Sequence, residues 1–377
     1  MRTLAVLVGL VSWVAATVAS AEPSPSPRIA AVAAKPSTEA AFWKQVAAEG
    51  TPLIEDIKDP KGRLLLTFVY RARPTTKHVA IYNAPNNVLI GYGQLERIPK
   101  TNVFATSMLV DPAARFIYAL APNDNFGVPV GMADVMRRMP LLQPDLLNKH
   151  PIETSGSAVT LPKAPPQPWR TPKRGTPTGT LTQYLTSTKG LPGKRPVLVY
   201  TPPGFSTTGP AYPLVVLFDG PGVAQAFAMP LVLEELIAAK KLPPVVVAMV
   251  GNADRMAELL PTPAFADHVA HDLVPWIRRT FHTTADPRST VLGGLSLGGL
   301  AAAYTAIRHP ATFGNVLSQS GSFWWSPDDA IESEHVSHDL AARSALPIRF
   351  WIECGVFESG SPKPDTSQIG ANRHLRD

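Results

Sequence analysis

Residues 289–300 have the sequence Ser-Thr-Val-Leu-Gly-Gly-Leu-Ser-Leu-Gly-Gly-Leu, and this stretch decides the fold. Its first part is apolar and β-rich, and the small residues at 301–306 that follow favour a helix. The pattern Gly-x-Ser-x-Gly between them is typical of a nucleophile elbow, whose turn leaves no room for flanking side chains. The serine then stands above the sheet, at a helix N-terminus that favours developing negative charge. We predict that Ser296 is a nucleophile; the alternative is a Gly-rich turn with a solvent-facing serine.

The rest of the C-terminal half alternates apolar strands with helices. The expected strands cover residues 197–200, 214–218, 245–250, 289–293, 315–318 and 348–354. The expected helices cover residues 226–242, 265–281 and 300–306. This alternation predicts a parallel sheet with helices on both faces. The predicted fold class is therefore α/β, with an α/β-hydrolase domain at residues 196–377.

The N-terminal half predicts a second domain. After a short helix at 38–48, the expected strands cover residues 64–70, 78–82, 88–92, 103–110 and 115–120. Several short strands at this spacing predict a β-sandwich, which we place at residues 38–150. Proline is frequent, with 40 residues among 377, and much of it lies in two stretches. We expect linkers there, at residues 22–37 and 151–195.

Residues 1–21 are typical of a secretory signal peptide. Arg2 supplies a positive charge, residues 4–18 are apolar, and Ala-Ser-Ala at 19–21 matches a cleavage site. The apolar run is short for a membrane span of about 20 residues, so an uncleaved anchor is the alternative. We expect an exported protein, periplasmic or secreted, without stable membrane insertion after cleavage.

Charge and cysteine content narrow the function classes. The formal net charge is +6, but the basic residues are dispersed, which argues against nucleic acid and leaves an anionic ligand open. Cys354 is the single cysteine, so an intramolecular disulfide is impossible. Its apolar neighbours predict a buried core thiol and not a nucleophile.

A serine nucleophile needs a base, a group that orients the base, and donors for an oxyanion. In the α/β-hydrolase order, the acid and then a histidine follow the serine. Glu358 follows the strand that ends at Cys354, and catalytic groups of such sheets lie beyond the carboxyl ends of strands. We predict Glu358 as the acid, with a solvated loop carboxylate as the alternative. Glu353 lies inside the strand and Asp365 in a Pro-rich loop, so both are weaker candidates.

The predicted oxyanion donors are two backbone N–H groups. One belongs to Leu297, directly after the serine. The other belongs to the loop after Phe218, where Pro221 has no N–H and Gly220 or Gly222 must supply it. We select Gly220; a plain turn is the alternative.

The sequence offers no clear candidate for the catalytic histidine. Only His374 follows Glu358, and a helix and a strand should precede the histidine loop, since a crossover takes at least about a dozen residues. His335 and His338 precede the acid; their spacing suggests a metal pair, but no third ligand is evident. The expectation is that His374 is not the base and that this chain stops before its catalytic histidine.

Motifs in both halves carry a family likeness. They are residues 42–43 (Phe-Trp), 50–55 (Gly-Thr-Pro-Leu-Ile-Glu), 67–71 (Thr-Phe-Val-Tyr-Arg), 145–148 (Asp-Leu-Leu-Asn), 217–220 (Leu-Phe-Asp-Gly), 255–259 (Arg-Met-Ala-Glu-Leu), the elbow, and 318–325 (Ser-Gln-Ser-Gly-Ser-Phe-Trp-Trp). With them the chain resembles the enterochelin (enterobactin) esterase family over residues 42–377. The second residue of the 145–148 motif departs from the Asp-Pro-Leu-Asn usual in that family.

The resemblance implies hydrolysis of the ester bonds that join catecholoyl-serine units in an iron-chelating siderophore, without a metal cofactor. Ser296 would attack the ester carbonyl, and Glu358 would orient a histidine. In the family that histidine lies in a Gly-Gly-His-Asp-like motif, which does not occur in this sequence. Arg255 and Glu258 match a substrate-side motif, in which Arg255 would face the anionic ferric catecholate. The alternative is an Arg–Glu pair that braces the loop.

Other functions stay open at this point. Trp324 and Trp325 would stack on catechol rings or simply pack. A hydrolase of other esters, such as feruloyl esters of plant polysaccharide, is one alternative to a siderophore esterase. A binding protein that holds a ligand without turnover is another, which the missing histidine motif favours for this chain.

Overall fold

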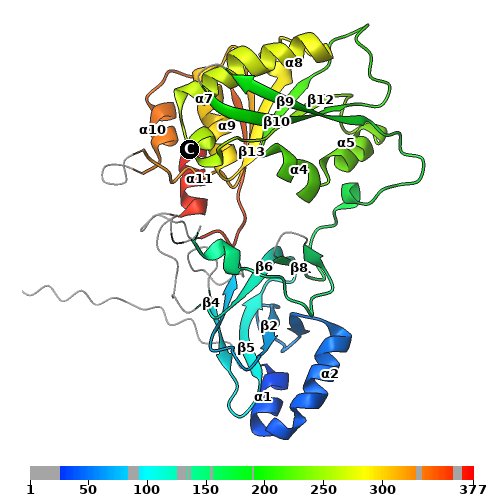
Figure 1. The fold of residues 1–377 in the computed structure, drawn as a ribbon, viewed down its shortest axis with the longest axis vertical. Helices are drawn as coiled ribbons and strands as arrows, with labels where there is room; N and C mark the ends of the chain where they lie inside the picture. Colours follow the sequence, from blue (N-terminus) through cyan, green and yellow to red (C-terminus); the bar gives the residue numbers. More distant parts are fainter. Residues whose placement is uncertain are drawn as a thin grey trace, which may run out of the picture.

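The computed structural model describes residues 26–83, 93–124, 134, 137–152, 156–188, 191–327, 333–359 and 367–377. These residues form two domains, one on an eight-stranded sheet and the other on a seven-stranded sheet. In Figure 1 the N-terminal domain (blue to cyan) lies below the C-terminal domain (green to red).

Two packed helices, α1 (Pro27–Ala34) and α2 (Glu39–Glu49), open the N-terminal domain, with a 3₁₀ turn at Pro36–Thr38 between them. The Ser26 side chain caps α1 by accepting a hydrogen bond from the N–H of residue 29, and proline occupies the first helical position. The buried isoleucine and valine of α1 pack in one apolar cluster with the aromatic residues of α2. The predicted linker at 22–37 is therefore wrong over α1, because apolar residues at helical spacing give this Pro-rich segment a buried face.

The N-terminal sheet is antiparallel, with strand order β1-β2-β5-β4-β3-β6-β8-β7. Its strands are β1 (Leu53–Glu55), β2 (Leu64–Arg71), β3 (Val79–Tyr82), β4 (Gly93–Arg97), β5 (Val103–Val110), β6 (Arg115–Pro122), β7 (Pro151–Ile152) and β8 (Gly156–Thr160). Three strands separate β2 from β6, yet the rings of Phe68 and Tyr118 meet with 4.8 Å between centroids. The sheet therefore folds over on itself around a shared core, as in the predicted sandwich. The expected strand at 88–92 lies outside the described residues.

The join between the domains is shorter than expected. Strands β7 and β8 still pair within the N-terminal sheet, and β9 (Thr180–Thr188) already belongs to the C-terminal sheet. Between them the described chain contains one helical element, a 3₁₀ turn at Pro168–Arg170. The linker predicted at 151–195 is therefore too long at both ends, because its proline content hid the β-pairing of its flanks.

The C-terminal sheet has the order β15-β14-β13-β11-β12-β10-β9. Its remaining strands are β10 (Leu191–Thr201), β11 (Leu214–Phe218), β12 (Val246–Val250), β13 (Thr290–Leu295), β14 (Asn315–Gln319) and β15 (Arg349–Glu353). Strands β11 to β15 pair in parallel, as predicted, whereas β9 and β10 add an antiparallel edge. The carboxyl ends of the parallel strands therefore meet at one edge, where the predicted site residues lie.

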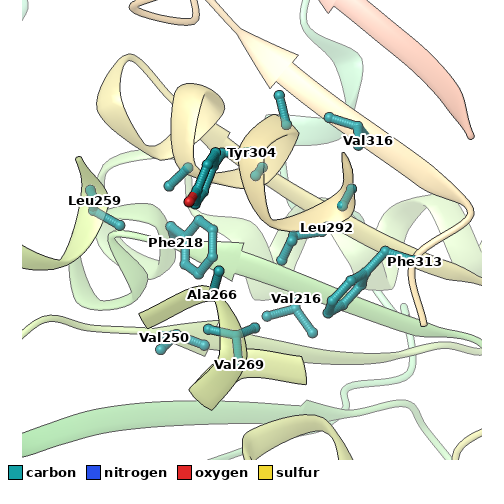
Figure 2. Packing of buried hydrophobic residues seen from close by; sticks show 14 of the residues in the cluster. Val216, Phe218, Val250, Leu259, Ala266, Val269, Leu292, Tyr304, Phe313 and Val316 are labelled. Carbon is teal, nitrogen blue, oxygen red and sulfur yellow. The ribbon is translucent and has the colours of Figure 1, made fainter. Parts of the chain in front are cut away.

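Helices cover both faces of this sheet (Figure 1). They are α4 (Gly220–Ala226), α5 (Met229–Ala238), α6 (Arg255–Leu259), α7 (Pro263–His268), α8 (Val274–Phe281), α9 (Leu297–Arg308), α10 (His335–Ala341) and α11 (Gln368–Arg376). Every residue of β12 is buried because its alternate side chains enter two cores. Val250 packs with α7 and α9 in the core shown in Figure 2, and Met249 packs with α4 and α5 on the opposite face.

Two expected helices differ in detail. The helix predicted at 226–242 corresponds to α5, which is shorter at both ends, and a helix that was not predicted, α4, precedes it. Ala228, directly before α5, has a left-handed backbone that separates the two helices. The helix predicted at 265–281 is present, but its centre, Val269–Leu273, is a π-helical turn. Pro275 explains the wider turn, since it has no N–H and its ring would clash with the carbonyl four residues earlier. Among the described residues no single helix is long and apolar enough to cross a membrane, and α4 with α5 meets that criterion only as a pair bent by 63°.

Candidate active site

Ser296 occupies the predicted turn between β13 and α9. Its backbone has φ 57° and ψ −119°, a conformation that costs an ordinary residue about 1–3 kcal/mol and must be held by its surroundings. The N–H of Ser296 donates to the Gln319 carbonyl over 2.9 Å, and its carbonyl accepts from the Leu300 N–H over 3.1 Å. The strained backbone and the partly exposed side chain are those of a nucleophile elbow.

Close backbone approach explains the glycines of the elbow. A Cβ atom on Gly294 would lie 2.6 Å from the carbonyl carbon of Gly298, so no side chain fits there. A Cβ atom on Gly299 would lie 2.5 Å from the Ser318 Oγ on the neighbouring strand β14. Helix α9 therefore packs directly onto the sheet, which brings its N-terminus to Ser296.

The predicted oxyanion donors both lie at the first position of a helix. Leu297 begins α9 and Gly220 begins α4, and the first N–H groups of a helix have no partner within it. The two helix starts are neighbours, since a Cβ atom on Gly298 would lie 3.5 Å from the Asp219 Oδ2. Gly220 admits no side chain, because a Cβ atom would overlap the Met249 carbonyl oxygen at 2.2 Å. The arrangement is compatible with the predicted oxyanion hole, which stays a prediction.

A second serine contacts the elbow and was missed by sequence reasoning. The Ser322 Oγ lies 3.1 Å from the Ser296 Oγ, and the Ser322 N–H donates to the Ser296 carbonyl over 3.1 Å. Ser322 is 2% exposed, so the protein holds this hydroxyl in place. The available signal was the Ser-Gln-Ser-Gly-Ser run at 318–322, but connecting it to the nucleophile requires knowing that β14 lies beside β13.

Glu358 lies in the loop after β15, as predicted, and its side chain is exposed. The carboxylate accepts hydrogen bonds from the Ser320 Oγ at 3.0 Å and the Cys354 Sγ at 3.4 Å. Ser320 and Ser322 belong to the same short loop after β14, so one loop touches both the predicted acid and the predicted nucleophile. This loop couples the ends of three adjacent strands.

Cys354 is half-buried, and the prediction of a core position is wrong. The strand before it, β15, is the edge strand of the described sheet, and its side chains are alternately exposed. Partial burial and the neighbouring Glu358 carboxylate raise the pKa of the thiol to about 12. The thiol therefore stays neutral at neutral pH, which agrees with the expectation that it is no nucleophile.

Helix α11 supports the loop after β14 from its other side. The Gln368 Nε2 donates to the carbonyls of Ser320 and Gly321, and the Asn372 Nδ2 donates to the Gly321 carbonyl over 2.8 Å. The Gln368 Oε1 accepts from the Trp324 Nε1 over 2.6 Å, and Trp324 is buried. Of the two roles considered for Trp324, the structure shows packing.

No histidine among the described residues bonds to Ser296 or Glu358. The Nδ1 of His374 lies 2.8 Å from the Glu334 Oε2 instead. This geometry agrees with the expectation that His374 is not the base. His335 and His338 are both exposed in α10.

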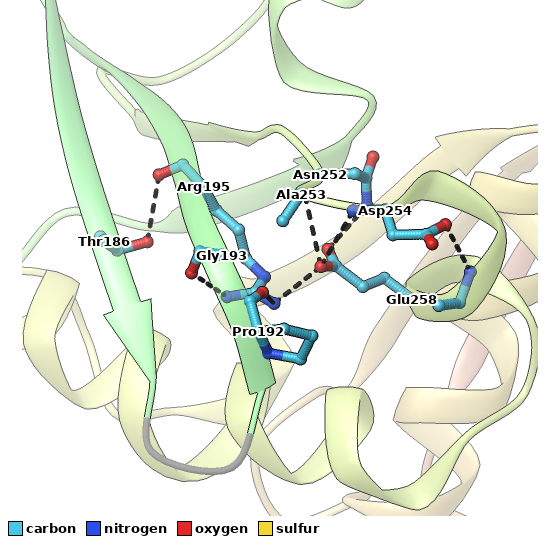
Figure 3. A network of polar contacts seen from close by, with 9 residues as sticks. Thr186, Pro192, Gly193, Arg195, Asn252, Ala253, Asp254 and Glu258 are labelled. Atoms are coloured by element: carbon cyan, nitrogen blue, oxygen red, sulfur yellow. Dashed lines mark hydrogen bonds and ion pairs between the residues drawn. The ribbon is translucent and has the colours of Figure 1, made fainter.

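Arg255 and Glu258 do not pair with each other. Arg255 forms a two-pronged ion pair with Asp219, with both N···O distances at 2.8 Å. Glu258 pairs instead with the fully buried Arg195, over 2.7 Å (Figure 3). The alternative, in which Arg255 and Glu258 brace the loop as a pair, is therefore wrong. Glu258 has another partner because β10 brings Arg195 beside it.

These pairs bear on the predicted substrate contacts. The Glu258 side chain is 4% exposed, so contact of its carboxylate with a ligand is not supported, and we reassign it to holding the loop after β12. The Arg255 side chain is 44% exposed, and Asp219 already balances its charge. Its position beside the elbow leaves the substrate-facing role a prediction.

Comparison with known proteins covers both domains. Residues 188–368 match the family model described as putative esterase, and residues 65–170 match that described as enterochelin esterase, N-terminal. The chain is 32% identical over 333 residues to an iron(III) enterobactin esterase of Dickeya dadantii, which covers 80% of this chain and 75% of the relative. The chain belongs to the enterobactin esterase family. The resemblance inferred from the motifs is thereby confirmed, and the protein is a carboxylic ester hydrolase.

Further relatives agree with this membership. The esterase is 28% identical over 360 residues to an iron(III) salmochelin esterase of Escherichia coli, which covers 87% of this chain and 84% of the relative. An enterobactin esterase from Shigella flexneri, solved in the presence of enterobactin, matches at 27% identity and a TM-score of 0.69, over 89% of this chain and 88% of that one. The ferric enterobactin esterase of Salmonella typhimurium matches at 26% identity and a TM-score of 0.71, over 89% of each chain. The predicted fold class is confirmed.

Proposed function

We propose that this esterase hydrolyses the ester bonds of an enterobactin-type catecholate siderophore. The observation that carries the proposal is the alignment with the Dickeya dadantii iron(III) enterobactin esterase, at 32% identity over 333 residues. The Shigella flexneri relative was solved in the presence of enterobactin, which supports the same substrate class. A net charge of +6 is compatible with an anionic ligand.

In the proposed mechanism the Ser296 Oγ attacks the ester carbonyl carbon while its proton passes to a base. The N–H groups of Leu297 and Gly220 stabilise the oxyanion that forms. The leaving hydroxyl takes up the proton, and water then releases the acyl group from Ser296. Glu358 orients the base, as the acid of a hydrolase triad does. Arg255 lines the substrate side of the site, beside Asp219.

Hydrolysis of ferric and iron-free enterobactin, followed by chromatography of the released dihydroxybenzoyl-serine, tests this function. Ser296→Ala should lower kcat by a factor on the order of 10³ or more with binding retained, because only the nucleophile is lost. Methyl ferulate in competition separates a siderophore esterase from a feruloyl esterase. Tight binding of enterobactin without turnover would fit a binding protein or a serine site without its catalytic base. Turnover that survives in Ser296→Ala would exclude the serine mechanism.

We also infer export to the periplasm or the medium. The support is the signal-like sequence of residues 1–21, which lie outside the described residues. Mass spectrometry of the protein from its producing cells tests this inference. A mature N-terminus at Glu22 supports export, and an intact N-terminus at Met1 contradicts it.

A further inference from the structure

A cluster of ligating side chains lies at the far end of α9 from the elbow. Asp267 of α7, His271 of the π-helical turn and His309, directly after α9, each place one ligand atom within 4.8 Å of the others. Helix α9 has 12 residues, so at about 1.5 Å per residue the cluster lies roughly 18 Å from Ser296. None of the three side chains therefore takes part in the proposed ester chemistry.

Local structure brings two of the three side chains together. Asp267 and His271 are four residues apart in one helical segment, a spacing that places side chains on one face. The π-helical turn Val269–Leu273 contains His271, and such turns occur frequently at functional sites. His309 is the C-cap of α9, where the negative end of the helix dipole favours a cation.

The distances suit a bound metal ion after small movements. The His309 Nε2 lies 2.8 Å from the Asp267 Oδ1, and the ring centroids of His271 and His309 are 4.8 Å apart. Around a tetrahedral Zn²⁺ with bonds of about 2.0–2.1 Å, ligand atoms lie about 3.3 Å apart. The distance between the Asp267 Oδ1 and the His309 Nε2 therefore increases slightly when the cation replaces the shared proton. The ring of His271, which is exposed, rotates to bring its nitrogen closer to the other two ligand atoms.

Arg308 is the competing partner of Asp267. Its Nη2 lies 3.2 Å from the Oδ1 and 3.5 Å from the Oδ2 of that carboxylate. A cation on the Oδ1 leaves the Oδ2 to Arg308. The guanidinium then orients the ligating carboxylate, as outer hydrogen-bond partners do at metal sites.

We propose that Asp267, His271 and His309 form a binding site for a divalent transition-metal cation, with water in the fourth position. Two imidazoles and one carboxylate are a ligand set that suits Zn²⁺ and its neighbours. The cation ties the α7–α8 segment to the end of α9. Its effect is on stability, because the site is remote from the elbow.

Calorimetric titration of the untagged protein with Zn²⁺ tests the site. We expect one Zn²⁺ per chain and a raised midpoint of thermal unfolding when it is bound. His271→Ala, at an exposed position, and Asp267→Asn should each weaken the affinity by about tenfold or more. His78→Ala removes an exposed histidine of the other domain and should leave the affinity unchanged.

Failure of the wild-type protein to bind Zn²⁺ stoichiometrically overturns the proposal. An affinity unchanged in either His271→Ala or Asp267→Asn overturns it as well, and leaves the cluster an ion pair with Arg308. Near-ultraviolet circular dichroism of each variant separates a lost ligand from a lost fold. The visible absorption of bound Co²⁺, which should disappear in His271→Ala, is a second measurement.

Discussion

The ring of Phe357 packs edge to face against the ring of Phe116, with 6.1 Å between their centroids. Phe357 precedes Glu358 in the loop after β15, and Phe116 lies in β6 of the N-terminal domain. Phe357 also packs against the apolar core of that domain. The N-terminal domain therefore supports the loop that carries the predicted acid.

Phe116→Leu keeps an apolar side chain but removes this ring contact. It should lower kcat/KM by roughly two- to tenfold, the equivalent of the 0.5–1.5 kcal/mol that an aromatic pair contributes. Steady-state hydrolysis of enterobactin measures the change. Ile117→Ala is the matched control, because this neighbour in β6 is 50% exposed and should leave kcat/KM unchanged. Equal losses in both variants would point to strand stability instead of the ring contact.

The Ser322 hydroxyl beside Ser296 should contribute to turnover. Ser322→Ala removes one neutral hydrogen bond, worth about 1 kcal/mol, so kcat should fall about fivefold with little change in KM. Ser318→Ala is the control, since the Ser318 Oγ is buried without a hydrogen-bond partner in the described part of the chain. Its loss should leave kcat unchanged and raise stability slightly. An unchanged kcat in Ser322→Ala would show that this contact does not orient the nucleophile.

Two glycines of α4 make a matched pair. Gly220→Ala should lower the midpoint of thermal unfolding and abolish most of the activity, because its Cβ atom would overlap the Met249 carbonyl oxygen at 2.2 Å. Gly222→Ala should leave both unchanged, because no atom lies within 4 Å of its Cβ position. Differential scanning calorimetry of the two variants is the measurement. Equal midpoints would contradict the close approach of α4 to β12.

Removal of one partner from the buried ion pair of Arg195 and Glu258 should strongly destabilise the protein. Glu258→Gln leaves the Arg195 charge buried without its counter-ion, so it should lower stability by about 3–5 kcal/mol. The double variant Arg195→Met with Glu258→Leu should recover most of this loss, because no charge remains buried. Urea unfolding of the esterase domain, monitored by fluorescence, measures both.

Arg255→Met is the comparison for that experiment. Its partly exposed pair with Asp219 should contribute only about 0–1 kcal/mol to stability, because solvent screens the charges. A loss in Glu258→Gln no larger than that in Arg255→Met would mean that solvent reaches Arg195.

Cys354 should react slowly with alkylating reagents. Its pKa is raised to about 12 in the folded protein, so at pH 9 the folded thiol is almost entirely neutral. Because the pKa is higher in the folded protein than in the unfolded chain, the neutral thiol contributes to the stability of the fold. This contribution is fully present below the unfolded pKa of 9.0 and is lost as pH rises from there toward 12. Iodoacetamide at pH 9 should label the unfolded chain much faster than the folded one. Glu358→Gln should speed labelling of the folded protein, and an unchanged rate would contradict the Cys354–Glu358 contact.

Local patterns were sufficient for much of the fold. The strand expected at 103–110 agrees with β5, because turn residues bound an apolar run on both sides. The helix α1 was missed because the proline content of its segment outweighed the spacing of Ile29 and Val32, which packing makes decisive. The π-helical turn was missed for a similar reason, since Pro275 alone does not say how the helix accommodates it.

The sequence by itself determined the elbow at Ser296, the α/β class and the family, because each depends on residues that are neighbours in the chain. Only the tertiary structure decided which distant side chains meet. Ser322 reaches Ser296 across 26 residues because β14 lies beside β13, and Arg195 reaches Glu258 across 63 residues because β10 lies beside β12. A turn forms from contacts within a few residues, whereas these pairs exist only once the sheet has set the order and register of its strands.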